Sequence, residues 1–269
     1  PITPIFYRAP TDNDLPPSRG WHDVFLHLAK PHPISCTTTT SAATNTATIT
    51  TTTRFAPPVL AWNILLTTVY AFTPTHLHIS IRGHPSGPKL PETLPLIGLE
   101  LGLNPQFNRA RWFGRGPGEG YSDTKMAQRF GNWEAGDEED GEGGRGLWTG
   151  YEWPQEGGGR TDVRWVEFSS SSSDGKDKDK GDEKEKKKRD TLKATFGSQN
   201  GCGFTANHFS TADLEECTHD YELQKRKKEG WVVRLDWKQH GIGSGSCGPG
   251  PGEQYMLRTG DFEFEIVLE

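Results

Sequence analysis

The first group of residues whose types could do chemistry is a run of three polar side chains, Asp12, Asn13 and Asp14, which follows Arg8. Adjacent Asp and Asn side chains accept hydrogen bonds from nearby backbone amides, so this run predicts an Asx-type turn. A calcium loop would need ligands at alternating positions over about a dozen residues and a glycine at its sharp turn, which is missing here. After the turn we expect a loop that runs to Trp21.

Two glycine-rich segments are the next candidates. Residues 112–123 contain a spacing similar to G-x-G-x-x-G, but the prolines and the lack of a following helical pattern exclude a dinucleotide-binding loop. The pattern favours a structured turn anchored by Trp112. Residues 241–249 surround Cys247 with small residues, which predicts a tight or flexible loop. The neighbouring His240 does not by itself indicate a nucleophilic Cys/His pair.

Acidic residues could act as general acids or nucleophiles in the hydrolysis of a glycosidic bond. That reaction needs two carboxylates that face the bond, roughly 5 to 10 Å apart. Five acidic residues lie near apolar or aromatic neighbours, but nothing in their spacing pairs any two of them: Glu100, Glu119, Glu152, Glu156 and Asp236. The sequence therefore assigns no catalytic residue.

The elements that must position these segments are predicted to be strands. Residues 37–55 are rich in threonine, which favours a strand or hairpin at a sheet edge, while an O-glycosylated stalk is the alternative. Residues 62–70, 76–82, 96–103 and 262–268 have further strand patterns, and the last alternates with period two. Because no apolar helical period continues beyond about two turns, we predict an all-β fold.

Two segments are predicted to lie outside the core. Residues 131–146 are rich in Gly, Glu and Asp, which predicts a loop. Residues 169–190 form a low-complexity insertion in which five serines precede charges of nearly balanced sign, a composition typical of a disordered loop. The insertion separates two strand-like segments, residues 162–168 and 191–196, and therefore extends a hairpin turn. A long loop adds little closure entropy, so we expect this insertion to be dispensable.

Composition restricts the class of protein. The 269 residues carry a net charge of −6 at pH 7, which does not suit binding to nucleic acid or acidic membranes. We find no apolar run long enough to span a membrane and no secretory leader, so we expect a single soluble domain over residues 1–269. Four scattered cysteines predict neither a zinc site nor a disulfide framework and favour a cytoplasmic location. Pro1 in place of an initiator Met is expected for a piece of a longer protein.

Five blocks of the sequence, in order, resemble the small-chain domain of glycoside hydrolase family 2 β-galactosidases. Residues 6–14 are similar to the opening of that domain, and residues 112–123 match its W-x-G-x-G-P-x-E-x-Y-x-D pattern. Residues 151–165, 209–223 and 235–249 are similar to its later blocks. Three features depart from the family: the charged insertion, Gly157 in place of Asn, and Cys247 where bacterial members often have Trp.

The resemblance implies a large antiparallel supersandwich, similar to galactose mutarotases, at the C-terminal end of a retaining β-galactosidase. Such an enzyme hydrolyses terminal β-D-galactose from β-galactosides such as lactose. Its catalytic glutamates and its magnesium and sodium ligands lie in an upstream barrel domain, so this chain is expected to hold no cofactor and to be inactive alone. The resemblance implies that this chain forms one wall of the sugar pocket. It indicates five residues as substrate-binding: Asp12, Asn13, Asp14, Ser246 and Cys247.

Alternatives stay open at this point. The chain could be an autonomous carbohydrate-binding or aldose-epimerase-like protein on the same fold, in which His208 and His219 would work with a nearby Glu. It could instead mainly support subunit contacts in a homo-oligomer. Cys247 has two interpretations of its own: it replaces an aromatic platform at the leaving-group side of the sugar, or it is a small buried residue.

Overall fold

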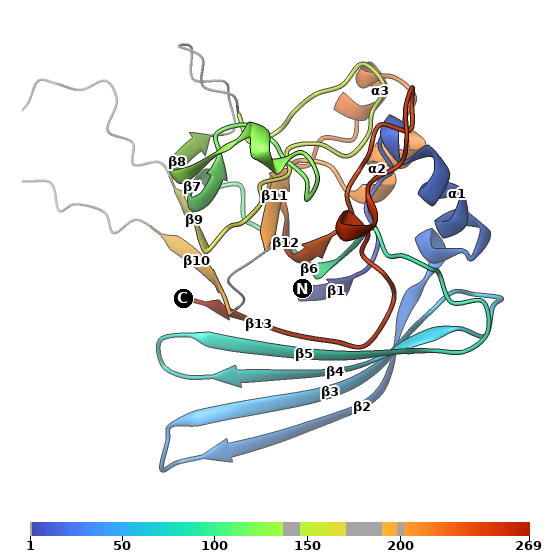
Figure 1. Cartoon of the computed structure of the whole chain (residues 1–269). Helices are drawn as coiled ribbons and strands as arrows, with labels where there is room; N and C mark the ends of the chain where they lie inside the picture. Colours follow the sequence, from blue (N-terminus) through green and yellow to red (C-terminus); the bar gives the residue numbers. More distant parts are fainter. Residues whose placement is uncertain (1, 137–145, 171–189, 198–201) are drawn as a thin grey trace, which may run out of the picture.

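The computed structural model describes residues 2–136, 146–170, 190–197 and 202–269, and in this part of the chain it forms two antiparallel sheets (Figure 1). The smaller sheet has the order β1 (Ile2–Ile5), β6 (Leu96–Gly102), β12 (Val232–Gln239) and β11 (Gly203–Asn207). The larger has the order β2 (Lys30–Ser41), β3 (Thr46–Ala56), β4 (Asn63–Phe72), β5 (Leu77–Ser86), β13 (Phe262–Leu268), β10 (Thr191–Phe196), β9 (Trp165–Ser170), β7 (Phe107–Gly116) and β8 (Arg129–Gly136). The predicted all-β antiparallel supersandwich is confirmed.

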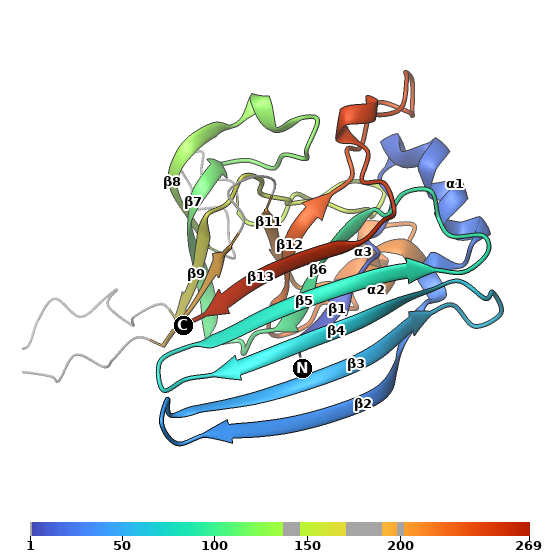
Figure 2. The ribbon, with the colours of Figure 1, turned by 60° about the horizontal axis from the view of Figure 1, so that its bottom comes forward.

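The core lies between the two sheets, and the smaller sheet occupies the concave side of the larger one (Figures 1 and 2). Strand β13 shows how the sequence builds this layer: Phe262, Phe264 and Ile266 are buried, while the glutamates between them face solvent. Aromatic rings join the sheets, since Phe204 of β11 packs edge-on against Trp112 of β7 at a centroid distance of 5.5 Å. Period-two alternation therefore predicts which face of a strand enters the core.

The threonine-rich segment forms the hairpin β2–β3, and β2 is the edge strand of the larger sheet. Every residue of β2 is exposed, which suits the hydroxyls and β-branched side chains of this segment. Pro31 and Pro33 lie in β2, and a proline is tolerated at a sheet edge because it has no N–H to donate to a neighbouring strand. The predicted edge hairpin is thus confirmed.

Strands β9 and β10 pair in an antiparallel hairpin on either side of the charged insertion, as predicted. Residues 171–189 of the predicted insertion at 169–190 lie outside the described residues, so its predicted disorder stays a prediction. The loop predicted for residues 131–146 is wrong at residues 131–136, because these residues belong to β8. Strand β8 pairs with β7, and the indole of Trp133 donates a hydrogen bond to the Gly114 carbonyl at 3.2 Å.

Helices are short: α1 (Leu15–Asp23), α2 (Thr211–Glu216) and α3 (Asp220–Gln224). The predicted loop up to Trp21 is wrong, since residues 15–23 form α1. A proline in the first turn fits the fixed backbone angle that a helix start requires, and the buried Trp21 fixes the helix to the core. Within the described residues no helix is long and apolar enough to cross a membrane.

Candidate functional site

Two loops that are distant in sequence meet at one place on the surface. We call them the N-terminal loop, residues 9–14, and the closing loop, residues 241–249. The Ser246 hydroxyl donates a hydrogen bond to Asn13 Oδ1 at 2.7 Å, although the two residues are 233 positions apart. The Gly245 N–H donates to the Asn13 carbonyl at 3.1 Å. In both ribbon views the closing segment lies beside α1, which follows the N-terminal loop (Figures 1 and 2).

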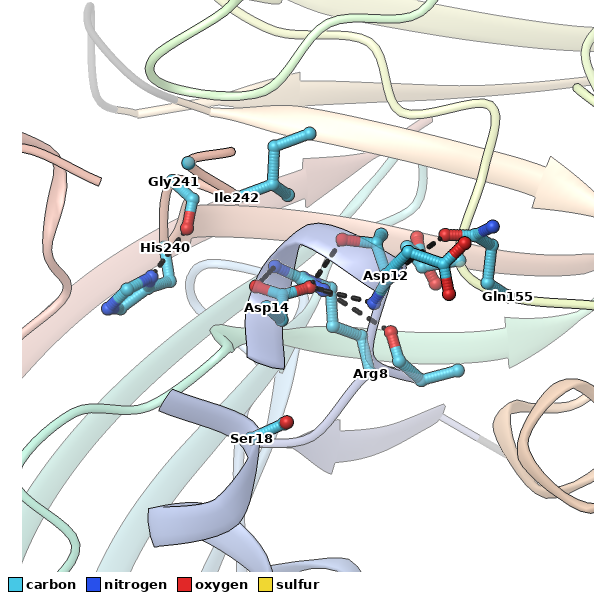
Figure 3. A network of polar contacts seen from close by, with 12 residues as sticks. Arg8, Asp12, Asp14, Ser18, Gln155, His240, Gly241 and Ile242 are labelled. Carbon is cyan, nitrogen blue, oxygen red and sulfur yellow. Dashed lines mark hydrogen bonds and ion pairs between the residues drawn. The ribbon is translucent and has the colours of Figure 1, made fainter. Parts of the chain in front are cut away.

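A buried ion pair holds the N-terminal loop. Both nitrogens of the Arg8 guanidinium end donate to the Asp14 carboxylate, at 2.8 and 3.0 Å, and both side chains are fully buried (Figure 3). The same carboxylate accepts from the Thr11 backbone N–H and from its hydroxyl, each at 2.8 Å. Burial alone would lower the pKa of Arg8, but the adjacent Asp14 raises it above its usual value, so the guanidinium stays charged.

This arrangement refines the prediction for residues 12–14. The side chain of Asp14 bonds the backbone of its own turn, as the Asx-type interpretation expects, and it presents no surface to a ligand. Asp14 can therefore affect a ligand site only by fixing the shape of the N-terminal loop. Asp12 is exposed, and its backbone N–H donates to the side-chain oxygen of Gln155 at 2.9 Å (Figure 3). Asn13 is half-buried and directs its side-chain oxygen to Ser246.

A single carboxylate anchors the closing loop. Asp123 accepts hydrogen bonds from the backbone N–H groups of Ile242, at 3.2 Å, and Gly243, at 2.7 Å. Gly243 has a φ of +66°, and a Cβ placed there would lie 2.6 Å from the Pro251 nitrogen. Only glycine fits both the backbone angle and the space. The start of the closing loop is consequently fixed against the segment of residues 112–123.

Cys247 is exposed at the tip of the closing loop, next to the Ser246 that bonds Asn13. The interpretation of Cys247 as a small buried residue is therefore wrong. The structure brings Asp12, Asn13, Ser246 and Cys247 into one surface region, and their contact with substrate stays a prediction. Cys36 is the other exposed cysteine, whereas Cys202 and Cys217 are buried.

The acidic residues singled out from the sequence occupy different environments. Glu156 is buried and pairs with the guanidinium of Arg234. Asp236 is also buried, which raises its pKa to about 6, while Arg234 opposes this shift. Glu119 accepts a hydrogen bond from the Tyr151 hydroxyl. Glu156 and Asp236 are enclosed by protein, so these two carboxylates do not face an open site, and we assign no catalytic pair.

The two histidines of the epimerase alternative are also placed. His208 lines a pocket of about 100 Å³, and no glutamate is among the described residues that line it. His219 precedes α3 and lies on the surface, 4.0 Å from the Glu222 carboxylate. No group of three or more His, Cys, Asp or Glu side chains lies within metal-binding reach in the described ranges.

Two residues at this site were present in the motifs but had no role assigned from sequence. Asp123 ends the block at 112–123 and binds the closing loop, and Gln155 belongs to the block at 151–165 and binds the N-terminal loop. The order of the motifs along the chain is the only feature of the sequence that points to these two residues. Each of the two motifs contributes one polar side chain that binds a loop. Their partners lie 120 and 143 residues away, too far for a spacing rule to find.

Comparisons with known proteins identify the family. Residues 1–268 match the family model described as beta galactosidase small chain. A beta-galactosidase of Kluyveromyces lactis is 27% identical over 264 residues, which are 98% of this chain and 23% of the relative. A beta-galactosidase of Priestia megaterium is 26% identical over 89% of this chain and 20% of the relative.

A solved structure, the GalM/aldose epimerase homologue from C. elegans, aligns with a TM-score of 0.41 at 12% identity, covering 87% of this chain and 68% of that one. The two structures are only distantly alike, and the strand pairing defines the fold of this chain. The chain spans about a quarter or less of the length of the beta-galactosidases cited above. The family match extends over nearly every residue, and the blocks that form the two loops lie within it, so the chain belongs to the beta-galactosidase small-chain family.

Proposed function

We propose that this chain forms one wall of the galactoside pocket of a larger retaining β-galactosidase, at the surface where the N-terminal loop meets the closing loop. In this proposal Asp12 and Asn13 supply polar groups, Ser246 fixes the two loops together, and Cys247 faces the leaving-group side of the sugar. Other domains of the same enzyme carry the catalytic glutamates and any magnesium or sodium ion.

The observation that carries the proposal is the Ser246–Asn13 hydrogen bond at 2.7 Å, which joins two family motifs from opposite ends of the chain. Ser246, Cys247 and Asp12 are all exposed, so a ligand at this surface can reach them. The scaffold beneath them is rigid, because the Arg8–Asp14 pair and Asp123 hold the two loops from inside. Groups held in this way are preorganised to bind a ligand.

The test is steady-state kinetics of the full-length enzyme with Ser246→Ala and Asn13→Ala. Either change removes the side-chain bond between the loops and leaves the backbone bond from Gly245 to Asn13 in place. We expect KM for a β-galactoside to rise about three- to tenfold, which corresponds to about 1 kcal/mol of lost binding. The double variant should show no further rise, because the two residues share one interaction. Ser35→Ala, on the exposed edge strand β2, is the matched control and should leave KM unchanged.

Strictly additive effects of the two substitutions, or kinetics equal to the parent in both single variants, would contradict the proposal. The 269-residue chain alone should show no turnover of a chromogenic β-galactoside. Turnover that survives stringent purification and disappears on substitution of a glutamate of this chain would place catalysis here instead.

A further inference from the structure

Strand β2 has an open outer edge in the described part of the chain, and it differs from the other three edge strands of the two sheets. Strand β11 is buried, and an isolated bridge pairs its Phe204 with Arg160. Strand β1 has four residues and contains Pro4, while β8 carries Arg129 and Glu134. Short length, proline and charge are features that prevent a sheet edge from pairing with another chain. Figure 2 shows β2 at the lower rim of the larger sheet, with no described segment beyond it.

Most of the β2–β3 hairpin lacks these protective features. Residues 34–53 contain no Asp, Glu, Lys or Arg and no proline or glycine, although charged residues make up 25% of the chain. In β2, such features lie only at the start of the strand: Lys30, two prolines and a register shift that ends at Ser35. From Ser35 to Ser41 the strand pairs with β3 without interruption. This stretch, rich in threonine, therefore presents a regular and unprotected edge.

The edge of β2 is complementary to a second copy of itself. Two copies related by a two-fold axis present the same strand to each other and pair antiparallel. An axis at Thr38, the midpoint of residues 35–41, lets this whole stretch pair: Thr37 lies opposite Thr39 of the other copy, and Cys36 lies opposite Thr40. Threonine pairs across antiparallel strands are favourable. The net charge of −6 makes two copies repel, and a neutral edge places no like charges opposite each other.

We propose that the chain forms a dimer in which the β2 strands of two copies pair antiparallel about Thr38, so that the two larger sheets become one continuous sheet. Every residue of β2 is exposed in one copy, and the pairing gives its outward backbone N–H and C=O groups hydrogen-bond partners. The inference does not depend on the proposed galactoside pocket, because the closing segment and β2 lie on opposite sides of the molecule in both ribbon views (Figures 1 and 2).

The first experiment is sedimentation velocity of the 269-residue chain over a range of concentrations. We expect a reversible equilibrium between monomer and dimer. Thr38→Lys places two like charges opposite each other at the axis and should raise Kd of the dimer at least about tenfold. Thr67→Lys is the matched control, because Thr67 is an exposed threonine of the same sheet in the interior strand β4, and it should sediment as the parent does. A cooperative thermal melt of each variant confirms folding.

A disulfide tests the register of the pairing. Thr40→Cys places a thiol opposite Cys36 of the other copy, so oxidation should give a covalent dimer of the chain and of the full-length enzyme. Cys247→Ser is included in each variant to remove the other exposed thiol. Positions 36 and 40 of one copy are about 13 Å apart along the strand, too far for a disulfide within the copy. Addition of Cys36→Ser to Thr40→Cys is the control and should prevent the cross-link.

Three results would overturn the proposal. The first is a chain that stays monomeric at every concentration, or a dimer that Thr38→Lys leaves intact. The second is a folded Thr40→Cys variant that gives no more covalent dimer than its Cys36→Ser control. The third is a cross-link in the chain but not in the full-length enzyme, which would place another domain of the enzyme on β2.

Discussion

The edge hairpin β2–β3 and the region where the two loops meet are built in opposite ways. In the hairpin, threonines are exposed in β2 and half-buried in β3, and the paired residues lie close in sequence, from Ser41 opposite Thr46 to Lys30 opposite Ala56. In the loop region, a few partly buried polar bonds join segments more than 100 residues apart. The stability of the hairpin therefore comes from many weak cross-strand pairs. The stability of the loop region depends on a few groups, and removal of one member of its buried ion pair leaves the other charge buried and unpaired.

The largest effect should follow from breaking the buried pair beneath the N-terminal loop. Asp14→Ala leaves the Arg8 guanidinium buried without its partner, and we expect the free energy of unfolding to fall by about 3 to 5 kcal/mol. Urea denaturation measures this change. Glu263→Ala removes one partner of the exposed Arg82–Glu263 pair between β5 and β13 and should cost far less stability, because water solvates both charges. Comparable losses in the two variants would contradict the expectation that a buried pair contributes much more than an exposed one.

A pH-dependent effect should come from the buried carboxyl of Asp236. Its pKa is raised to about 6 in the folded chain from an ordinary value of 3.8, so folding favours the protonated form. The stability that this group contributes is present below about pH 4 and is lost as the pH rises through 6. Asp236→Asn, which is neutral throughout, should therefore gain stability relative to the parent between pH 4 and 7, on the order of 1 to 3 kcal/mol.

Thermal melts of both proteins across this pH range measure the difference. A constant gap between the two melting temperatures would show that Asp236 is already ionised in the folded chain at pH 4. Glu263→Gln serves as the control for the loss of a carboxylate at an exposed position, and its gap from the parent should not grow with pH.

The smallest effect is expected in the hairpin. Thr39→Ala lies in the exposed edge strand, opposite Thr48, and should change the free energy of unfolding by less than about 0.5 kcal/mol. Urea denaturation again provides the measurement. A loss above about 2 kcal/mol would show that the edge strand carries a concentrated interaction, like those of the loop region.

The same contrast explains what the sequence could predict. Strand β13 and the threonine-rich hairpin can be predicted from the local alternation of apolar and polar residues and from strand propensity. The burial of each side chain there depends only on the face of the sheet on which it lies. Helix α1 was missed since its nine residues include prolines and a glycine, and its formation depends on Trp21 packing into the core. Strand β8 was missed because its glycines resemble a loop until β7 pairs with them.

The site was predictable as a pair of loops but not as a set of bonds. Family resemblance indicated Asn13 and Ser246, and the structure joins them. The bonds from Gln155 to the Asp12 N–H and from Asp123 to the closing loop use backbone partners, whose position no residue type reveals. Asp14 was grouped with its neighbours by type, yet burial separates its role from that of the exposed Asp12.

The most direct test of the central claim is the kinetics of Cys247→Trp in the full-length enzyme, measured with β-galactosides of several different leaving groups. Cys247 is exposed beside Ser246. Under the proposed function it faces the leaving-group side of the sugar, so an indole there would add a stacking surface. We predict that KM shifts by about two- to tenfold, differently for each leaving group, while kcat changes less because the reacting centre is untouched. Parent values of KM for every leaving group would contradict the claim that the closing loop contacts substrate.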